Sequence, residues 1–284
     1  MSVETALRVI SSRSMRWSSP LKFNDPFDHQ IGFSYDFNGE QFGQKLLEEM
    51  EQIVFGGKTE FKQPTLLSNL AMKLGSIKDR LPKEKIINAF TTTTNKMADN
   101  LDDHLRKINN SIIEVLTHSR VLCVSECHDN VVMWSHYGDK HQGVVLQLQC
   151  IDEIDNTLLA ARKVEYSLEL PRFPPLESYL QHLTGEEPMD FAQLSWELAF
   201  TKHKDWSYEK EWRVHIPLLD EPPGDGYSIY IENPRVFGAV YLGCLISDDN
   251  ADKVIEAVRE HIPAATIYRG RKSTRSFNLS FDEV

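Results

Sequence analysis

The 284-residue sequence lacks the features that mark membrane-spanning, secreted and low-complexity proteins. No apolar run reaches the roughly 18 residues that a membrane-spanning helix needs, which argues against an integral membrane protein. The first residues contain no continuous apolar core with a small-residue cleavage site, so no secretory signal is expected. Four cysteines are too few for a disulfide framework, and reduced thiols in the cytoplasm are the expectation. The 14 glycines and 13 prolines are too few for a low-complexity chain.

Positive charge is also scarce, because 31 Lys and Arg residues stand against 42 Asp and Glu, a formal net charge of −11. An acidic protein does not attract nucleic acid through its overall field. The only dense basic cluster is RGRKSTR, residues 269–275. The simplest interpretation of that cluster is a solvated turn between two strands.

The spacing of apolar residues predicts a helical block followed by strands that alternate with helices. Between about residues 39 and 118, apolar residues recur every three or four positions, which indicates helices, with one long amphipathic helix expected over 83–118. Residues 1–37 are expected to form short strands and loops. A further helix is expected over 187–203, and later strands at 120–126, 143–149, 163–167, 211–217, 227–232 and 237–243. The pattern predicts an α+β fold, organised as a single domain over 1–284 with a mostly helical insertion at about 39–118.

One polar cluster with candidate chemistry is MWSHYGDKHQG, which lies after a predicted strand. In a short helix begun by Asp129 or Asn130, the residues Met133, His136 and Tyr137 share a face. A histidine and a tyrosine on that face could stack on a planar ligand and hydrogen-bond to it. The alternative is a core histidine and tyrosine whose polar atoms are satisfied within the protein.

A second polar cluster is DWSYEKEWRV, residues 205–214. The alternation of a strand places Glu209, Glu211 and Arg213 on one face. Two neighbouring carboxylates repel each other unless a cation or ligand lies nearby. Arg213 could be that cation in an exposed strand with surface ion pairs. Alternatively, the carboxylate pair binds a ribose hydroxyl and stabilises an oxocarbenium-like cation, as cleavage of a glycosidic bond requires.

Metal and thiol chemistry are the rival interpretations of the remaining polar residues. A zinc site is disfavoured because the spacing matches no common ligand set and one cysteine lies in an apolar strand. The residues of that set are Cys123, Cys127, His128, His136 and His141. A nucleophilic cysteine has no third residue that would orient a histidine partner. A metal-dependent nuclease of the defence type would need a carboxylate cluster such as Asp25, Asp28 and Glu126, and the acidic charge disfavours it.

Four sequence blocks, taken together and in order, resemble a bacterial family named domain of unknown function 2971 (DUF2971). The blocks are SSPLKFNDPFD, VLCVSECHDNVVMWSHYGDKHQGVVLQL, WSYEKEWRV and AVYLG. Members of the family usually open with a strand that carries a Tyr-Lys-Tyr-like motif. TALRVISS stands at that place here. The opening element is therefore missing, altered or represented by Arg8.

The order of elements is similar to that of ADP-ribosyltransferases, a resemblance that implies a mixed or antiparallel split sheet. In those enzymes an early basic strand and a serine or aromatic strand precede a late strand opened by Glu-x-Glu or a single glutamate. The Glu209-Lys210-Glu211 segment has this form, and the strands over 213–243 are similar to those that come after the glutamate in such enzymes. The resemblance implies that NAD is the substrate.

The same resemblance implies roles for individual residues. Glu211 or Glu209 would hold the nicotinamide ribose and stabilise the cationic transition state. The implied NAD-contacting residues comprise three pairs: His136 or Tyr137 touching NAD, Trp134 or Tyr208 packing on the nicotinamide ring, and Asn24 with Asp25 lining the rim. Ser135 belongs to the same block.

The expected function is therefore a cytoplasmic NAD-dependent ADP-ribosyltransferase, a toxin or effector of a bacterial defence or toxin–antitoxin system. It would transfer ADP-ribose to a protein or nucleic-acid acceptor, and a cognate antitoxin or other inhibitory partner could restrain it. The alternative is a non-catalytic protein that binds a partner or a nucleotide. The discriminator is the convergence of side chains: if Glu209, Glu211 and His136 do not line one cleft, the enzyme hypothesis loses its geometric basis.

Overall fold

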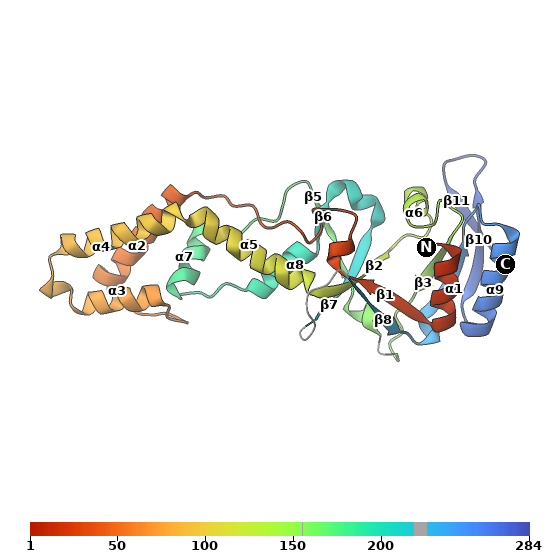
Figure 1. The fold of residues 1–284 in the computed structure, drawn as a ribbon, viewed down its shortest axis with the longest axis horizontal. Helices are drawn as coiled ribbons and strands as arrows, with labels where there is room; N and C mark the ends of the chain where they lie inside the picture. Colours follow the sequence, from red (N-terminus) through yellow and green to blue (C-terminus); the bar gives the residue numbers. More distant parts are fainter. Residues whose placement is uncertain (155, 219–225) are drawn as a thin grey trace. The chain divides into compact units, whose positions relative to one another are not determined.

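The computed structural model describes residues 1–154, 156–218 and 226–284, and its chain divides into two compact units (Figure 1). Unit 1 comprises Met1–Gln30, Thr117–Leu168 and Phe200–Val284, whereas unit 2 comprises Ile31–Leu116 and Glu169–Ala199. The fold is α+β with mixed and antiparallel sheets, as the sequence predicts. The single-domain organisation stays a prediction. Part of the strand-rich run over 213–243 lies outside the described residues.

Unit 1 contains a five-stranded sheet in which every neighbouring pair is antiparallel. Its strands in spatial order are β4 (Arg162–Lys163), β7 (Glu211–Pro217), β2 (Ser119–Ser125), β1 (Ser14–Ser18) and β8 (Tyr227–Ile231). One face carries an apolar core of alternating residues from four strands and two 3-10 turns. Its buried members are Met15, Trp17, Leu122, Leu158, Val214 and Val236.

A four-stranded mixed sheet forms the other part of unit 1, with β10 and β9 parallel and the remaining pairs antiparallel. Its order is β11 (Leu279–Glu283), β10 (Thr266–Lys272), β9 (Phe237–Leu242) and β3 (Val144–Leu148). The helices α1 (Val3–Ser12) and α9 (Asp248–His261) share an apolar core with one face. Trp134 of α6 (Val131–His136) packs against Ala239 and Tyr241 on the other face.

Short elements complete unit 1 and bring chain segments to the five-stranded sheet. The parallel pair β5 (Glu165–Ser167) and β6 (Thr201–His203) is followed by the 3-10 helix η4 (Lys204–Glu209), which leads into β7. The remaining 3-10 helices are η1 (Pro20–Lys22), η3 (Thr157–Ala160) and η5 (Pro234–Val236).

Unit 2 is helical, and the helices predicted between residues 39 and 118 are present. They are α2 (Gly39–Phe55), α3 (Leu66–Ser76), η2 (Lys78–Arg80), α4 (Lys83–Asp99) and α5 (Leu101–Thr117). A second segment adds α8 (Phe191–Ala199) and α7 (Leu176–Thr184) to the same unit, and the sequence did not predict α7. The helices α2 and α4 approach closely because a Cβ on Gly43 would already touch the Cβ of Ala98.

Three local predictions were wrong for identifiable reasons. Residues 3–12 form α1 rather than strands, because Ser2 caps the helix and Ala6 and Ile10 bury one of its faces. The long helix expected after Pro82 breaks at Asn100 into α4 and α5. The helix expected to reach His203 ends at Ala199, and the next residues pair with β5.

No helix in the described part of the chain is long and apolar enough to span a membrane.

Candidate functional site

The strand β7 presents opposite chemistry on its two faces, because successive side chains point to opposite sides of a sheet. Val214 belongs to the apolar core, with Ile216 packed against it. Glu211, Arg213 and His215 lie on the other face. The paired residue of Arg213 on β2 is Cys123, so the thiol stands on the same face as the charges.

Two glutamates converge there on one buried ammonium group. Lys202 Nζ of β6 lies 2.6 Å from Glu209 Oε2 and 3.0 Å from Glu211 Oε2. All three side chains are buried, with residue exposures of 7%, 4% and 5% for Lys202, Glu209 and Glu211. A buried ion pair needs close partners because its charges have lost the solvation of water. Lys202 supplies one such partner to both carboxylates.

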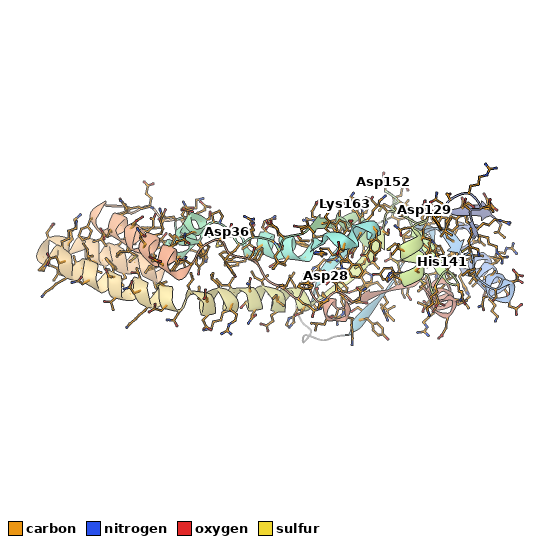
Figure 2. The ribbon with its side chains drawn as sticks, turned by 90° about the horizontal axis from the view of Figure 1, so that it is seen from above. Asp28, Asp36, Asp129, His141, Asp152 and Lys163 are labelled. Atoms are coloured by element: carbon orange, nitrogen blue, oxygen red, sulfur yellow. The ribbon has the colours of Figure 1, made fainter. Side chains whose placement is uncertain are left out.

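Arg213 continues the cluster toward the loop after β1. Its guanidinium donates to both oxygens of Glu211, from Nε at 2.7 Å and from Nη2 at 3.0 Å. It also donates to both oxygens of Asp28, from Nη1 at 2.8 Å and from Nη2 at 2.5 Å. Asp28, labelled in Figure 2, in turn contacts Nδ1 of His29 at 2.7 Å. Such two-point contacts between arginine and carboxylate fix geometry as well as charge.

The cluster carries an excess of one formal negative charge. Burial raises the pKa of Asp28, but the hydrogen bond from His29 and the charge of Arg213 lower it below its usual value overall. Burial likewise raises the pKa of Glu211, and the charges of Arg213 and Lys202 lower it below its usual value overall. Burial lowers the pKa of His29, so its ring stays neutral. Three carboxylates therefore face two cations, and a positively charged group bound nearby would balance them.

Cys123 is a free cysteine on the charged face of β2. The protein packed around the thiol, together with the charge of Glu211, raises its pKa well above the usual value. Because the thiolate is the nucleophilic form, the structure gives no support to a cysteine nucleophile.

Aromatic rings form an arc beside the Lys202–Glu209 pair, and we call Trp206, Tyr208, His136 and Tyr137 the aromatic arc. Successive ring centroids lie 6.1, 6.4 and 6.2 Å apart. Trp206 lies over the Lys202 ammonium at 5.0 Å, a cation–π contact. At the other end, the Tyr137 hydroxyl donates to Glu209 Oε1 at 2.7 Å. Tyr137 is 43% exposed, so the arc connects the buried carboxylate to the surface.

The predicted carboxylates are brought together, although not in the predicted way. Glu211 opens β7 and shares a face with Arg213, as the alternation indicates. Glu209 is instead the last residue of η4, and Lys210 between the two adopts a left-handed conformation with φ of 44°. The turn at Lys210 redirects the chain, so the convergence does not come from strand alternation. The alternative of an exposed strand with surface ion pairs is wrong, because these side chains are buried.

The other residues that the sequence predicts to contact NAD differ in their burial and in their contacts. Asn24 Nδ2 lies 3.5 Å from the Tyr137 hydroxyl. Asp25 is buried, and its Oδ2 has no hydrogen-bond partner among the described residues. Two residues of α6 lie away from the carboxylate cluster: Trp134 is buried in the core and donates from Nε1 to the His128 carbonyl, and Ser135 contacts His141. Neither residue belongs to the aromatic arc.

Sequence reasoning missed Lys202, because its segment was expected to continue a helix. The available signal was the change from an apolar helical pattern to Thr201, a β-branched residue that favours a strand. The pairing of Asp28 with Arg213 spans 185 positions of sequence, and no local pattern predicts such a contact.

The early strand β1 carries one basic residue, Arg16. Arg8 lies on α1 and pairs with Glu4 on the surface. Arg16 and Ser18 are alternate residues of β1, and Ser18 pairs with Val121, which pairs with His215. Arg16 thus belongs to the same sheet face as the buried charges, and its guanidinium lies 5.5 Å from the ring centroid of Tyr227.

The candidate metal ligands do not assemble. Among the described residues, no group of three or more His, Cys, Asp or Glu side chains is placed to hold a metal ion. Asp28 is bound by Arg213, and Glu126 contacts Trp212 and Lys163 instead. His141, also labelled in Figure 2, contacts Ser135.

A family model described as a protein of unknown function (DUF2971) matches residues 133–214. This match supports the resemblance noted in the sequence for that part of the chain. The matched segment begins in α6 and ends in β7, so it contains the aromatic arc, Lys202, both glutamates and Arg213, whereas Asp28 precedes it. No curated protein and no solved structure matches the chain.

Proposed function

We propose that the chain is an NAD-dependent ADP-ribosyltransferase in which the buried carboxylate cluster stabilises positive charge on the ribose. The observation that carries the proposal is the convergence of Glu209 and Glu211 on Lys202, beside an aromatic arc that reaches the surface. The acceptor would be a protein or a nucleic acid.

The neighbouring strands β1, β2 and β7 support the proposal. The resemblance to ADP-ribosyltransferases involves a basic strand, a serine or aromatic strand and a strand opened by a glutamate. Here Arg16, Ser125 and Glu211 lie on three adjacent strands of one sheet, in the order β7-β2-β1. Ser125 is the paired residue of Glu211. This arrangement supports fold-level analogy, which the chemistry of the site must then justify.

The charge of the cluster suits the proposed chemistry. In ADP-ribosyl transfer, the bond between ribose C1′ and the nicotinamide nitrogen breaks, and nicotinamide leaves with the bonding electron pair. The ribose becomes an oxocarbenium-like cation until the acceptor attacks C1′ and loses its proton. A cluster with an excess negative charge in a buried position stabilises such a cation more than water does, because little reorganisation is needed.

Glu209 is the better placed carboxylate for contact with a ribose. Both oxygens of Glu211 are bound by Arg213, and Lys202 adds a third contact. Among the described residues, Glu209 Oε1 is bound by the half-exposed Tyr137 hydroxyl alone. A ribose hydroxyl can replace a phenol at that oxygen without breaking a buried ion pair. We therefore assign substrate contact to Glu209 and the positioning of Lys202 to Glu211.

The direct experiment measures nicotinamide release from NAD by the purified chain, with and without added cell lysate as a source of acceptor. We expect release by the wild type and a loss of at least about 100-fold in Glu209→Gln, the effect of removing one preorganised electrostatic group. Glu232→Gln is the matched control, because Glu232 is also buried in unit 1 and contacts Thr157 outside the cluster. Equal rates for wild type and Glu209→Gln would contradict the assignment, and no release in either condition would contradict the function.

Glu211→Gln separates positioning from substrate contact. Because Glu211 holds Arg213 and Lys202, its replacement should lower both the melting temperature and the rate of release. Glu209→Gln should lower the rate with a smaller change in melting temperature. If Glu209→Gln lowers the melting temperature more than Glu211→Gln does, then Glu211 contacts the substrate and Glu209 positions Lys202.

The biological role as a toxin or effector is tested by induced expression in a bacterial host. We expect the wild type to arrest growth and Glu209→Gln to permit it at the same protein level. If expression of the wild type does not affect growth, the toxin role is wrong, but the proposed reaction is not contradicted.

The packing favours one second candidate, a non-catalytic protein that binds a partner or nucleotide. Glu209 and Glu211 are buried, whereas His136 is exposed and contacts the rings of Tyr137 and Tyr208. The three side chains thus do not share one exposed surface. On this interpretation the ion pairs are structural, and Glu209→Gln would change stability without changing any reaction of NAD.

A further inference from the structure

The turn between β10 and β11 combines free positive charge with an exposed aromatic ring. The two strands pair from Tyr268 with Glu283 to Lys272 with Leu279. In the turn, Phe277 is 99% exposed. Lys272 and Arg275 are also exposed, and among the described residues neither has an ion-pair partner. Figure 1 shows this turn standing clear of the neighbouring ribbon.

The turn is held in a defined shape by its own hydrogen bonds. The Ser273 amide donates to the Asn278 carbonyl at 3.0 Å, which closes the turn at its base. The Ser273 and Ser276 hydroxyls lie 3.2 Å apart, and the Arg275 amide donates to Ser273 Oγ. An exposed phenyl ring on an ordered turn loses little conformational freedom when it binds a partner.

Two other basic residues of β10 have ion-pair partners within the described part of the chain, unlike Lys272 and Arg275. Arg269 pairs with Asp248 at 2.6 Å, and Arg271 pairs with Asp282 at 2.5 Å. Those two cations are neutralised by the protein, whereas Lys272 and Arg275 keep their charge for a partner. Free cations next to an exposed ring, on a chain with a net charge of −11, mark a local departure from the overall field.

We propose that the β10–β11 turn binds single-stranded nucleic acid, with Phe277 stacking on a base and Lys272 and Arg275 contacting phosphates. A ring stacks on any base, and cations follow the backbone, so this combination recognises single strands without sequence preference. The hydroxyls of the turn are further donors for phosphate oxygens. An anionic lipid surface would also attract the cations, but one apolar side chain among serines and threonine gives little insertion energy.

The hairpin contacts α6, the helix that directly precedes Tyr137, through aromatic rings within unit 1. Phe281 of β11 stacks on Trp134 of α6 at 5.9 Å and contacts the ring of His128 at 5.2 Å. Tyr137 directly follows α6. The proposal for nucleic-acid binding does not rest on the proposed reaction, because binding is measured in the absence of NAD.

The test measures binding of the purified chain to a fluorescent oligothymidylate of about 12 nucleotides, within the roughly 4–16 nucleotides of known single-strand sites. We expect Phe277→Ala to lower affinity at least about fivefold, the loss of one stacked base. Phe277→Tyr should retain affinity, and Phe277→Leu should not, because leucine is apolar but cannot stack. The double variant Lys272→Gln/Arg275→Gln should make the dependence of log affinity on log salt shallower by about 1.4, the value for two phosphate contacts on a single strand.

The matched controls change an exposed apolar residue and two exposed cations in unit 2. Leu66 is 92% exposed on α3, and Lys73 and Arg80 are exposed nearby in sequence. Leu66→Ala and Lys73→Gln/Arg80→Gln should bind as the wild type does. The proposal is overturned if the wild type does not bind the oligonucleotide, or if Phe277→Ala and the double variant bind with unchanged affinity and salt dependence. Binding to phosphatidylserine vesicles without binding to the oligonucleotide would assign the turn to a lipid surface and would also overturn it.

Discussion

The two faces of the five-stranded sheet are both buried near β7, but they are stabilised in different ways. One face packs apolar side chains such as Trp17 and Val214. The other holds Glu211 and Arg213, which depend on ion pairs with Lys202 and Asp28. Apolar packing gains free energy from removing surface from water, with no special geometry. Buried charges lose the free energy of hydration, and only closely placed partners of opposite charge compensate for that loss.

Burial alone does not show whether a residue contributes to stability. Replacing a buried ion pair by apolar residues of similar volume is often neutral or stabilising. A cluster of five buried charged groups therefore stabilises this face of the sheet less than apolar residues of similar volume would. Its presence next to an apolar face on the same strand favours a role in binding or chemistry.

The largest expected effect comes from breaking the charged face at its centre. Arg213→Met leaves Asp28 and Glu211 buried without their guanidinium partner and should lower the free energy of unfolding by about 3–5 kcal/mol. Val214→Ala, the adjacent residue on the apolar face, should cost about 2 kcal/mol from lost methyl burial. Urea denaturation of both variants measures the difference. A smaller cost for Arg213→Met than for Val214→Ala would show that the two faces are not stabilised differently.

A pH series should show a second difference between the faces. Burial lowers the pKa of His29 and lowers that of His215 to about 3, from a usual value of 6.5. Below pH 6.5 the unfolded chain binds a proton at His215 that the folded chain does not bind, so stability falls as pH decreases from 6.5 toward 3. The expected slope from His215 is about 1.4 kcal/mol per pH unit, and His29 contributes in the same direction; urea denaturation measures it. His215→Phe should reduce that slope, and an unchanged slope would contradict the neutral state of His215 in the folded chain.

The smallest expected effect tests the link between Glu209 and the surface. Tyr137→Phe removes the hydroxyl that donates to Glu209 and should lower the free energy of unfolding by about 1 kcal/mol. Tyr230→Phe makes the same chemical change against the apolar face, where the ring packs on Trp17. It should have almost no effect on the denaturation midpoint. Equal effects of the two substitutions would mean that the Tyr137 hydroxyl contributes no more than an ordinary exposed phenol.

Much of the local structure followed from the sequence because periodicity and capping are local properties. Strand alternation located β2, β3, β7 and β9, and Asn130 was one of the two caps predicted for α6. The helices between 39 and 118 followed from their three-and-four spacing. The missed helix α1 also had local signals, since Ser2 accepts a capping hydrogen bond and Ala6 and Ile10 lie four positions apart.

The candidate site was predictable only in part. The Glu-Lys-Glu spacing identified two carboxylates that do meet, but the alternation of a strand was the wrong reason for Glu209. Trp134 illustrates the opposite error, because its neighbours in sequence are near the arc while its indole lies in the core. On a short helix, adjacent residues point in different directions, and only packing decides which one faces the site.

Local chemistry along the chain controls where strands alternate, where helices are capped, and which blocks carry unusual polar residues. The packing of the folded chain brings Lys202 and Asp28 to Glu211 and Arg213, and places Tyr137 rather than Trp134 against Glu209. These partners lie far apart along the chain. A buried charge must find a partner somewhere, but the sequence does not say where, because pairing across many residues depends on how the sheet and its loops pack.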